Sequence, residues 1–287
     1  MASAALMIPF SLWAEEKKPC ELVFEQLRQF IQTYLGMAIN DSFYSEWKEG
    51  YQHYVYVSEN SSIKRPENEP YFRFFGSDVE KAREAQNELI ARGFHTMLYR
   101  TAATSAAKIY SPLATYPNHC LSFIAFHEAH HIHRKSGERK AIPYSFEEAA
   151  GDVLGNYASV DFAHQFPNIV DIKNVQHQIK INEKLYKKIN TTRKKIDAGK
   201  NAEKAYKQLE HYIQRLLKNE DNFKKDRFLY PINNAFFIRY GYYTANYFLL
   251  KQLYQHAKSP IKFLAYLDTL PETETEAIAK VKSILQS

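Results

Sequence analysis

The residues best suited to chemistry in this chain lie in one short run, His-Glu-Ala-His-His. Helical residues four apart share a face and are one turn apart, so His127 and His131 can present their ring nitrogens to one ion. Glu128 lies beside that face, where a carboxylate can take a proton from metal-activated water. The pattern predicts metal-dependent hydrolysis. His130 and His133 are rotated away, and we expect them outside the ligand set, in outer contacts or in solvent.

A third ligand is needed, because a catalytic zinc site has three protein ligands and leaves the fourth position to water. The next predicted helix offers Glu148 as that ligand and Asp152 on the same face, where its carboxylate can fix the tautomer of a ligand histidine. Glu148 also has a structural alternative, since Ser145 and Glu148 fit a capping box. A cap alone does not explain Asp152. We expect one Zn²⁺ ion, which cobalt or manganese can replace in such a site.

Hydrolysis by this route also needs a donor to the oxygen that becomes negative in the transition state. The aromatic segment that follows Asn233 supplies Tyr243 as the first candidate, followed by Tyr240 and Arg239. Tyrosines at helical spacing are often simply packed in a core, and that alternative stays open for Tyr243.

Apolar spacing and glycine stops predict a mixed region in the first hundred residues. Its expected elements are a helix over 21–36, a strand over 51–58, a strand over 70–75, a helix over 78–92 and a strand over 94–100. From about residue 117 the pattern is helical throughout. The expected helices cover 118–134, 145–158, a hairpin of two helices over about 173–227 that projects from the body or lies over it, a long helix over 232–257, and two short helices opened by Pro260 and Pro271.

The predicted fold class is therefore α+β and predominantly helical. We divide the chain into a candidate signal or anchor segment (1–20), a mixed α/β subdomain (21–116) and a helical subdomain (117–287). The last carries the zinc site and the basic hairpin (about 173–227).

Composition places the chain among globular proteins, with 45% apolar and 24% charged residues and only 9 Gly in 287 residues. The hairpin segment from Lys173 to Arg227 has 16 Lys and Arg against 7 Asp and Glu, a local charge of +9, which leaves −3 for the rest given the net charge of +6. An arm that binds nucleic acid or a membrane surface is one interpretation, but Lys-rich helical hairpins are usually solvated faces, so no nucleic-acid partner is expected. We expect no integral membrane span, because no run approaches ~18 apolar residues.

Two cysteines, Cys20 and Cys120, exclude a disulfide framework and a Cys-based zinc finger, while a single bridge between them stays open. The N-terminus, MASAALMIPFSLWAEEKK, has a short apolar run before two glutamates, as in a signal peptide, but lacks a basic region at its start. We expect a periplasmic or otherwise exported protein, with a buried anchor in a cytoplasmic protein as the alternative.

These motifs resemble known metallopeptidases. His-Glu-x-x-His followed by Glu-x-x-x-Asp on the next helix is similar to the gluzincins, the thermolysin-like class. The order of PYFRFF, a helix, GFHTMLYR, IAFHEAHH, SFEEAAGD and INNAFF resembles a family of bacterial zinc aminopeptidases, from about residue 34 to about residue 270. The resemblance implies a gluzincin-like helical body and gives Glu148 the ligand role.

Two segments depart from that family, and both concern the region near the cleft. The family usually has Phe-Asn-Glu-Ser-Phe-Ala at the third ligand, whereas this chain has FEEAAG over 146–151, so Glu147 replaces the usual Asn. Before the metal helix the family usually has Tyr-Ser-Thr-Leu-Gly-Trp, and this chain has AAKIYS over 106–111. The ligands are unaffected, but contacts with substrate are expected to differ.

We therefore predict a zinc-dependent metallopeptidase that acts on a peptide or protein substrate. Aminopeptidase action is implied by the resemblance alone, because a pocket for a free amine needs carboxylates around the metal and Glu147 is the only nearby candidate. The alternative is a helical binding or scaffold protein whose metal site is structural or degenerate.

Overall fold

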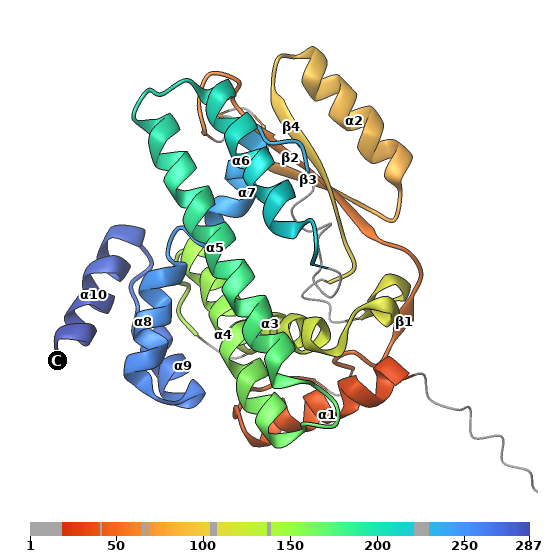
Figure 1. Ribbon diagram of the computed structural model, residues 1–287, viewed down its shortest axis with the longest axis vertical. Helices are drawn as coiled ribbons and strands as arrows, with labels where there is room; N and C mark the ends of the chain where they lie inside the picture. Colours follow the sequence, from red (N-terminus) through yellow and green to blue (C-terminus); the bar gives the residue numbers. More distant parts are fainter. Residues whose placement is uncertain are drawn as a thin grey trace, which may run out of the picture.

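The protein consists of a small sheet with one covering helix and a larger body of helices (Figure 1). The computed structural model describes residues 19–40, 42–64, 67, 69–103, 108–136, 139–220 and 230–287. The fold is α+β and mainly helical, as predicted. Nearly all of the candidate signal segment lies outside the described residues. No helix in the described ranges has the length and apolar character needed to cross a membrane.

The sheet has three strands in the order β3-β2-β4. β2 (Gln52–Ser58) is central, and β3 (Phe72–Gly76) and β4 (His95–Thr101) both pair with it in antiparallel register. Helix α2 (Val79–Ala91) connects the two outer strands and begins at Asp78, whose side chain accepts a hydrogen bond from the Lys81 amide. All four elements were predicted, with ends one or two residues away from those observed.

Alternation along the strands gives the sheet two different faces. On one face Val55 and Val57 pack with Leu89 of α2 in a small separate core. The opposite face is aromatic and is turned toward the helical body (Figure 1). Its rings are those of Tyr54, Tyr56, Phe72, Phe74 and Tyr99.

Helices α3 (Asn118–Lys135) and α4 (Tyr144–Gln165) form the centre of the helical body and pack against each other. The carbonyl of Pro143 accepts the first two amide hydrogen bonds of α4, so Pro143 holds the N-cap position. Ser145 lies inside the first turn and donates its hydroxyl to Glu274 Oε1 at 3.0 Å. The capping-box interpretation of Glu148 is therefore wrong.

Helices α5 (Ile172–Asp197) and α6 (Ala202–Leu217) form the predicted hairpin. α5 packs along α4 and α7, with Leu185 and Ile189 fully buried. The hairpin thus lies over the body and does not project as an arm (Figure 1). Residues 221–227 of the predicted hairpin are outside the described part of the chain.

The single long helix predicted over 232–257 is instead two helices, α7 (Asn234–Thr244) and α8 (Tyr247–Ala257). The break lies at Asn246, whose buried amide donates to Ser145 Oγ at 3.1 Å and to Glu274 Oε1 at 2.8 Å. Because a buried amide needs such partners, this contact holds the chain in a turn that apolar spacing does not reveal.

The other elements complete the body around this centre. They are α1 (Pro19–Thr33), β1 (Trp47–Lys48) paired in parallel with β5 (Ile109–Tyr110), the 3₁₀ turn η1 (Ser111–Thr115), α9 (Pro260–Asp268) and α10 (Glu274–Gln286). α1 packs on α3 through Phe30 and Phe126, whose ring centroids are 5.6 Å apart. Cys20 and Cys120 do not form a disulfide with each other.

Candidate metal centre

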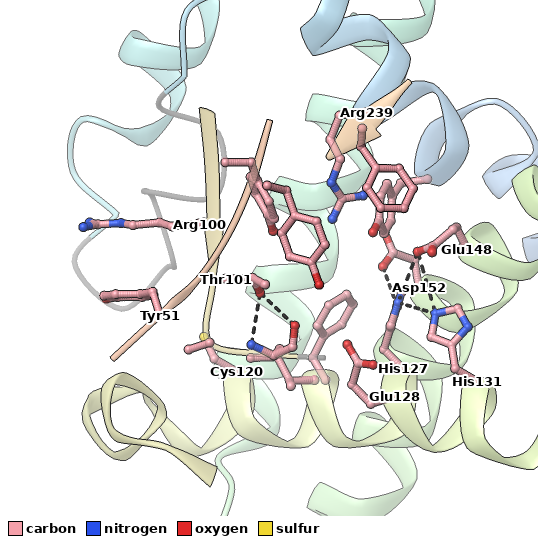
Figure 2. A pocket seen from close by; sticks show the side chains of 18 of the residues that line it. Tyr51, Arg100, Thr101, Cys120, His127, Glu128, His131, Glu148, Asp152 and Arg239 are labelled. Atoms are coloured by element: carbon pink, nitrogen blue, oxygen red, sulfur yellow. Dashed lines mark hydrogen bonds and ion pairs between the residues drawn. The ribbon is translucent and has the colours of Figure 1, made fainter. Parts of the chain in front are cut away.

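Helix α3 directs two histidine rings toward one point, as the spacing of four residues requires. His127 and His131 are both buried, and their Nε2 atoms are 3.1 Å apart. Glu148, from the first turns of α4, completes the group: its Oε2 lies 3.5 Å from His127 Nε2 and 3.7 Å from His131 Nε2. The three ligand atoms lie within 4.8 Å of one another (Figure 2).

Carboxylates behind the two rings fix which nitrogen of each ring faces Glu148. His127 Nδ1 is 3.0 Å from Asp152 Oδ1, and His131 Nδ1 is 2.9 Å from Glu147 Oε1. Asp152 is itself fully buried and accepts a hydrogen bond from the Tyr186 hydroxyl. In the neutral form protonated at Nδ1, next to its carboxylate, each ring presents the lone pair of its Nε2 to the centre.

With both rings neutral and protonated at Nδ1, the centre offers three electron-pair donors. Oε2 of Glu148 is buried and makes no hydrogen bond within the described residues. A buried carboxylate oxygen without a partner is costly, and a divalent cation satisfies it together with both Nε2 atoms. Two imidazoles and one carboxylate are the donor set of a catalytic zinc site, so the residues fit that ion.

A glycine on α4 makes room for the first ligand ring. An ideal Cβ at Gly151 would lie 2.8 Å from His127 Nδ1 and 2.9 Å from its Cε1. These separations are below van der Waals contact, so a larger residue at this position conflicts with the observed ring position. Gly151 is thus part of the support of the ligand and not only a packing position.

The charges of the histidines and of the carboxylates at the centre shift each other's pKa values. Burial opposes protonation of His131, but the charge of Glu148 and the contacts with Glu147 and Glu148 outweigh it and raise the pKa of His131 to about 10. Burial opposes ionisation of Glu148 as well, yet His131 and His127 hold the pKa of that carboxyl well below its usual value. The same negative charge would also attract a divalent cation, in competition with the proton.

Glu128 projects from α3 into the cavity beside the ligand histidines (Figure 2). Burial raises its pKa, and the neighbouring His127 and His131 only partly oppose that effect. A raised pKa makes this carboxylate a better proton acceptor, which suits a general base.

A cavity of about 570 Å³ opens onto this centre and is bounded by the sheet on the opposite side. The aromatic face of β2, β3 and β4 forms one wall, and residues of α3, α4, α5 and α7 line much of the rest. The size of the cavity is typical of a substrate pocket, and its lining combines aromatic side chains with charged and polar ones, several of which gather at the candidate metal centre.

Two of the three donor candidates on α7 reach the cavity. The Tyr243 ring stacks on His127, with centroids 5.9 Å apart and planes at 21°, and Arg239 extends over Tyr243. Tyr240 is buried against Phe236, with centroids 4.4 Å apart, and does not line the cavity.

His130 and His133 stand outside the ligand cluster, as expected from the helix geometry. Neither is in solvent, however. His130 is completely buried, and Nδ1 of His133 accepts a hydrogen bond from the Ala38 amide at 3.1 Å. Helix α3 is buried on most sides by α1 and α4, which the local sequence does not reveal.

The contact of Glu147 with His131 was missed by the sequence analysis, which considered Glu147 only for a substrate amine. The signal was present: both ligand rings need a partner for the second nitrogen, and Asp152 can serve only one of them. Tyr144, at the start of α4, also lines the cavity and was not singled out.

Comparison with known proteins finds no family model, no curated protein and no solved structure that matches this chain. The function therefore has to be inferred from the geometry of the centre and from the pattern of its residues.

Proposed function

We propose that this protein is a zinc-dependent metallopeptidase that hydrolyses peptide bonds in a peptide or protein substrate. The observation that carries the proposal is the convergence of His127, His131 and Glu148 at one end of a large cavity, with Glu128 directed into the same space. A purely structural site has a fourth protein ligand and is closed. Here three donors converge and the fourth side faces the cavity.

The proposed reaction assigns a task to each side chain. When bound, a zinc ion supplies Lewis-acid polarisation of the peptide carbonyl and lowers the pKa of a water molecule to about 7. Glu128 accepts the proton of that water and then donates it to the leaving amine. Tyr243 is proposed to donate its hydroxyl to the carbonyl oxygen as negative charge develops there. Asp152 and Glu147 hold the two imidazoles in place throughout.

Aminopeptidase action is the narrower proposal, and its support is the resemblance of the motif order to bacterial zinc aminopeptidases. Glu147 has its carboxylate engaged with His131 and is 22% exposed at its side chain. It therefore supports the ligand first, and a substrate amine would have to share it. Peptides with free and with blocked N-termini distinguish the two modes: an aminopeptidase cleaves only the free set.

The central test combines metal content, stability and activity of Glu128→Gln. We expect the variant to bind one equivalent of zinc and to melt near the wild-type temperature, while peptide hydrolysis falls by about 10²–10⁴-fold because the proton acceptor is lost. Metal is measured by atomic absorption, melting by circular dichroism and activity with a peptide library. Asp161→Asn, which neutralises a half-buried carboxylate outside the cavity, is the control and should retain activity.

Two outcomes would contradict the proposal. Zinc-loaded wild-type protein that cleaves none of the library peptides would favour the scaffold alternative. Loss of both zinc and folding in Glu128→Gln would point the same way, because it would make Glu128 part of a structural centre.

A further inference from the structure

Arg239 occupies an unusual position in the cavity. It extends from α7 between the sheet and the metal centre, and its guanidinium is surrounded by aromatic rings (Figure 2). Its Cζ atom is 4.0 Å from the centroid of Tyr243, 4.7 Å from that of Tyr99 and 5.4 Å from that of Tyr56. The rings hold the group through their π faces, and its N–H donors make no hydrogen bond to any residue that the structure describes.

No carboxylate in the described part of the chain pairs with Arg239. It makes neither an ion pair nor a hydrogen bond there, and its Nε atom is buried without a partner. Other cations of the chain do have such partners; Arg134, for example, binds Asp268. A guanidinium carries five N–H donors in a fixed fork; here the Nε donor is buried without an acceptor, which is costly, while the half-buried residue lines the cavity. The three ring contacts and the charge of Glu148 stabilise the cation, but they leave the Nε donor without an acceptor, which a ligand would supply.

The distance from Arg239 to the metal centre suits a peptide. Tyr243 lies between them, because its ring contacts both the guanidinium and His127. The two centroid distances limit the separation between Arg239 Cζ and the His127 ring to about 10 Å, the length of roughly three extended residues. A group bound at Arg239 and a peptide bond at the metal centre can therefore belong to one substrate.

We propose that Arg239 binds a carboxylate of the substrate, so that the enzyme prefers peptides with an acidic group within about three residues of the bond that is cut. The proposal deepens the peptidase function and rests on it. The carboxylate is either an Asp or Glu side chain or the C-terminal α-carboxylate. The two sources present the same fork-matching pair of oxygens and differ in where they lie along the peptide.

The test compares peptides that differ only in that charge. Oligoalanine peptides carry a single Glu or Gln at each position in turn, and a second set has the C-terminus free or amidated. We expect wild-type kcat/KM to be about 10–100-fold higher for the charged member of the preferred pair, the range of a charge-assisted hydrogen bond pair. A Glu effect at one position identifies a side chain, and an effect of amidation alone identifies the α-carboxylate.

Arg239→Gln should reduce that ratio to about one, and Arg239→Lys should give an intermediate ratio because it keeps the charge but lacks the fork. Arg83→Gln, which removes an exposed cation from α2, is the matched control and should leave the ratio unchanged. A wild-type ratio near one overturns the proposal even if the Arg239 variants do not fold. An unchanged ratio in a folded Arg239→Gln, with both rates reduced alike, also overturns it and assigns Arg239 to the reaction itself.

A binding measurement separates failure of this proposal from failure of the peptidase function. The same peptide pairs are titrated calorimetrically into zinc-loaded Glu128→Gln protein with and without Arg239→Gln. Tighter binding of the acidic member, lost with Arg239, supports the carboxylate site even if no peptide is cleaved. Hydrolysis without any preference in rate or binding leaves the peptidase function standing and refutes the carboxylate site.

Discussion

Substitution of Gly151 by alanine is expected to weaken zinc binding without unfolding the protein. The new Cβ would lie 2.8 Å from His127 Nδ1, whereas carbon contacts are comfortable near about 3.5 Å. The ring must therefore move by about 0.7 Å, several times the ~0.2 Å tolerance of metal–ligand distances. The same movement disturbs the 3.0 Å contact between His127 Nδ1 and Asp152.

Disturbance of a ligand's supporting contact typically reduces metal affinity by about 10–100-fold, which corresponds to about 1.4–2.7 kcal/mol. The stability of the metal-free protein should change much less. Alanine is favoured over glycine inside a helix by about 1 kcal/mol, which offsets part of the overpacking, and the atoms that must yield belong to one side chain. Competition with a chromogenic chelator measures the affinity, and thermal melting of the chelator-treated protein measures the stability.

Gly155→Ala is the matched control, one turn further along α4. Its Cβ would lie 2.8 Å from the backbone oxygen of Phe123, which cannot move away as a side chain does. This variant should lose stability while its folded fraction keeps the affinity for zinc. If Gly151→Ala binds zinc within about twofold of wild type, or if the two variants behave alike, the role given to Gly151 as support of His127 is refuted.

Asp152→Ala should raise the zinc dissociation constant about 10–100-fold, because it removes the carboxylate behind His127. It should also lower the free energy of unfolding by about 1–3 kcal/mol, because the buried Tyr186 hydroxyl loses a hydrogen-bond acceptor. Chelator competition measures the affinity and thermal melting the stability, and an unchanged affinity would contradict the assignment of Asp152. Without metal, protonated His131 stabilises the fold. The stabilisation is complete below the unfolded pKa of 6.5 and is lost as the pH rises through the folded pKa of about 10. The melting temperature of chelator-treated protein should therefore fall between pH 7 and 10, and less so in His131→Gln; equal falls would show that other groups are responsible.

The part of the centre that the sequence revealed is the part set by local geometry. His127 and His131 share a face because the helical period fixes it, and Glu148 and Asp152 share a face for the same reason. The strands and α2 could also be predicted from the sequence, since the strand pattern and the cap at Asp78 are local signals.

The remaining features depend on contacts between segments far apart in the chain. Asn246 ends α7 through bonds to Ser145 and Glu274, more than 25 residues away on either side. The pairing of Glu147 with His131 and the ring of tyrosines around Arg239 arise only when the sheet, α3, α4 and α7 are assembled. Periodicity predicts the face of the helix on which a side chain lies, but not the residue that it contacts in the folded protein.

The two faces of the sheet pack differently, and this difference has a consequence for how the protein can evolve. Val55 and Val57 anchor the strands to α2 from one side, while the tyrosines on the other side border the cavity. The candidate metal ligands come from neither set. Substitutions of the tyrosines can thus change what the cavity accepts, while the valines keep the strands packed on α2 and the candidate ligands on α3 and α4 stay in place.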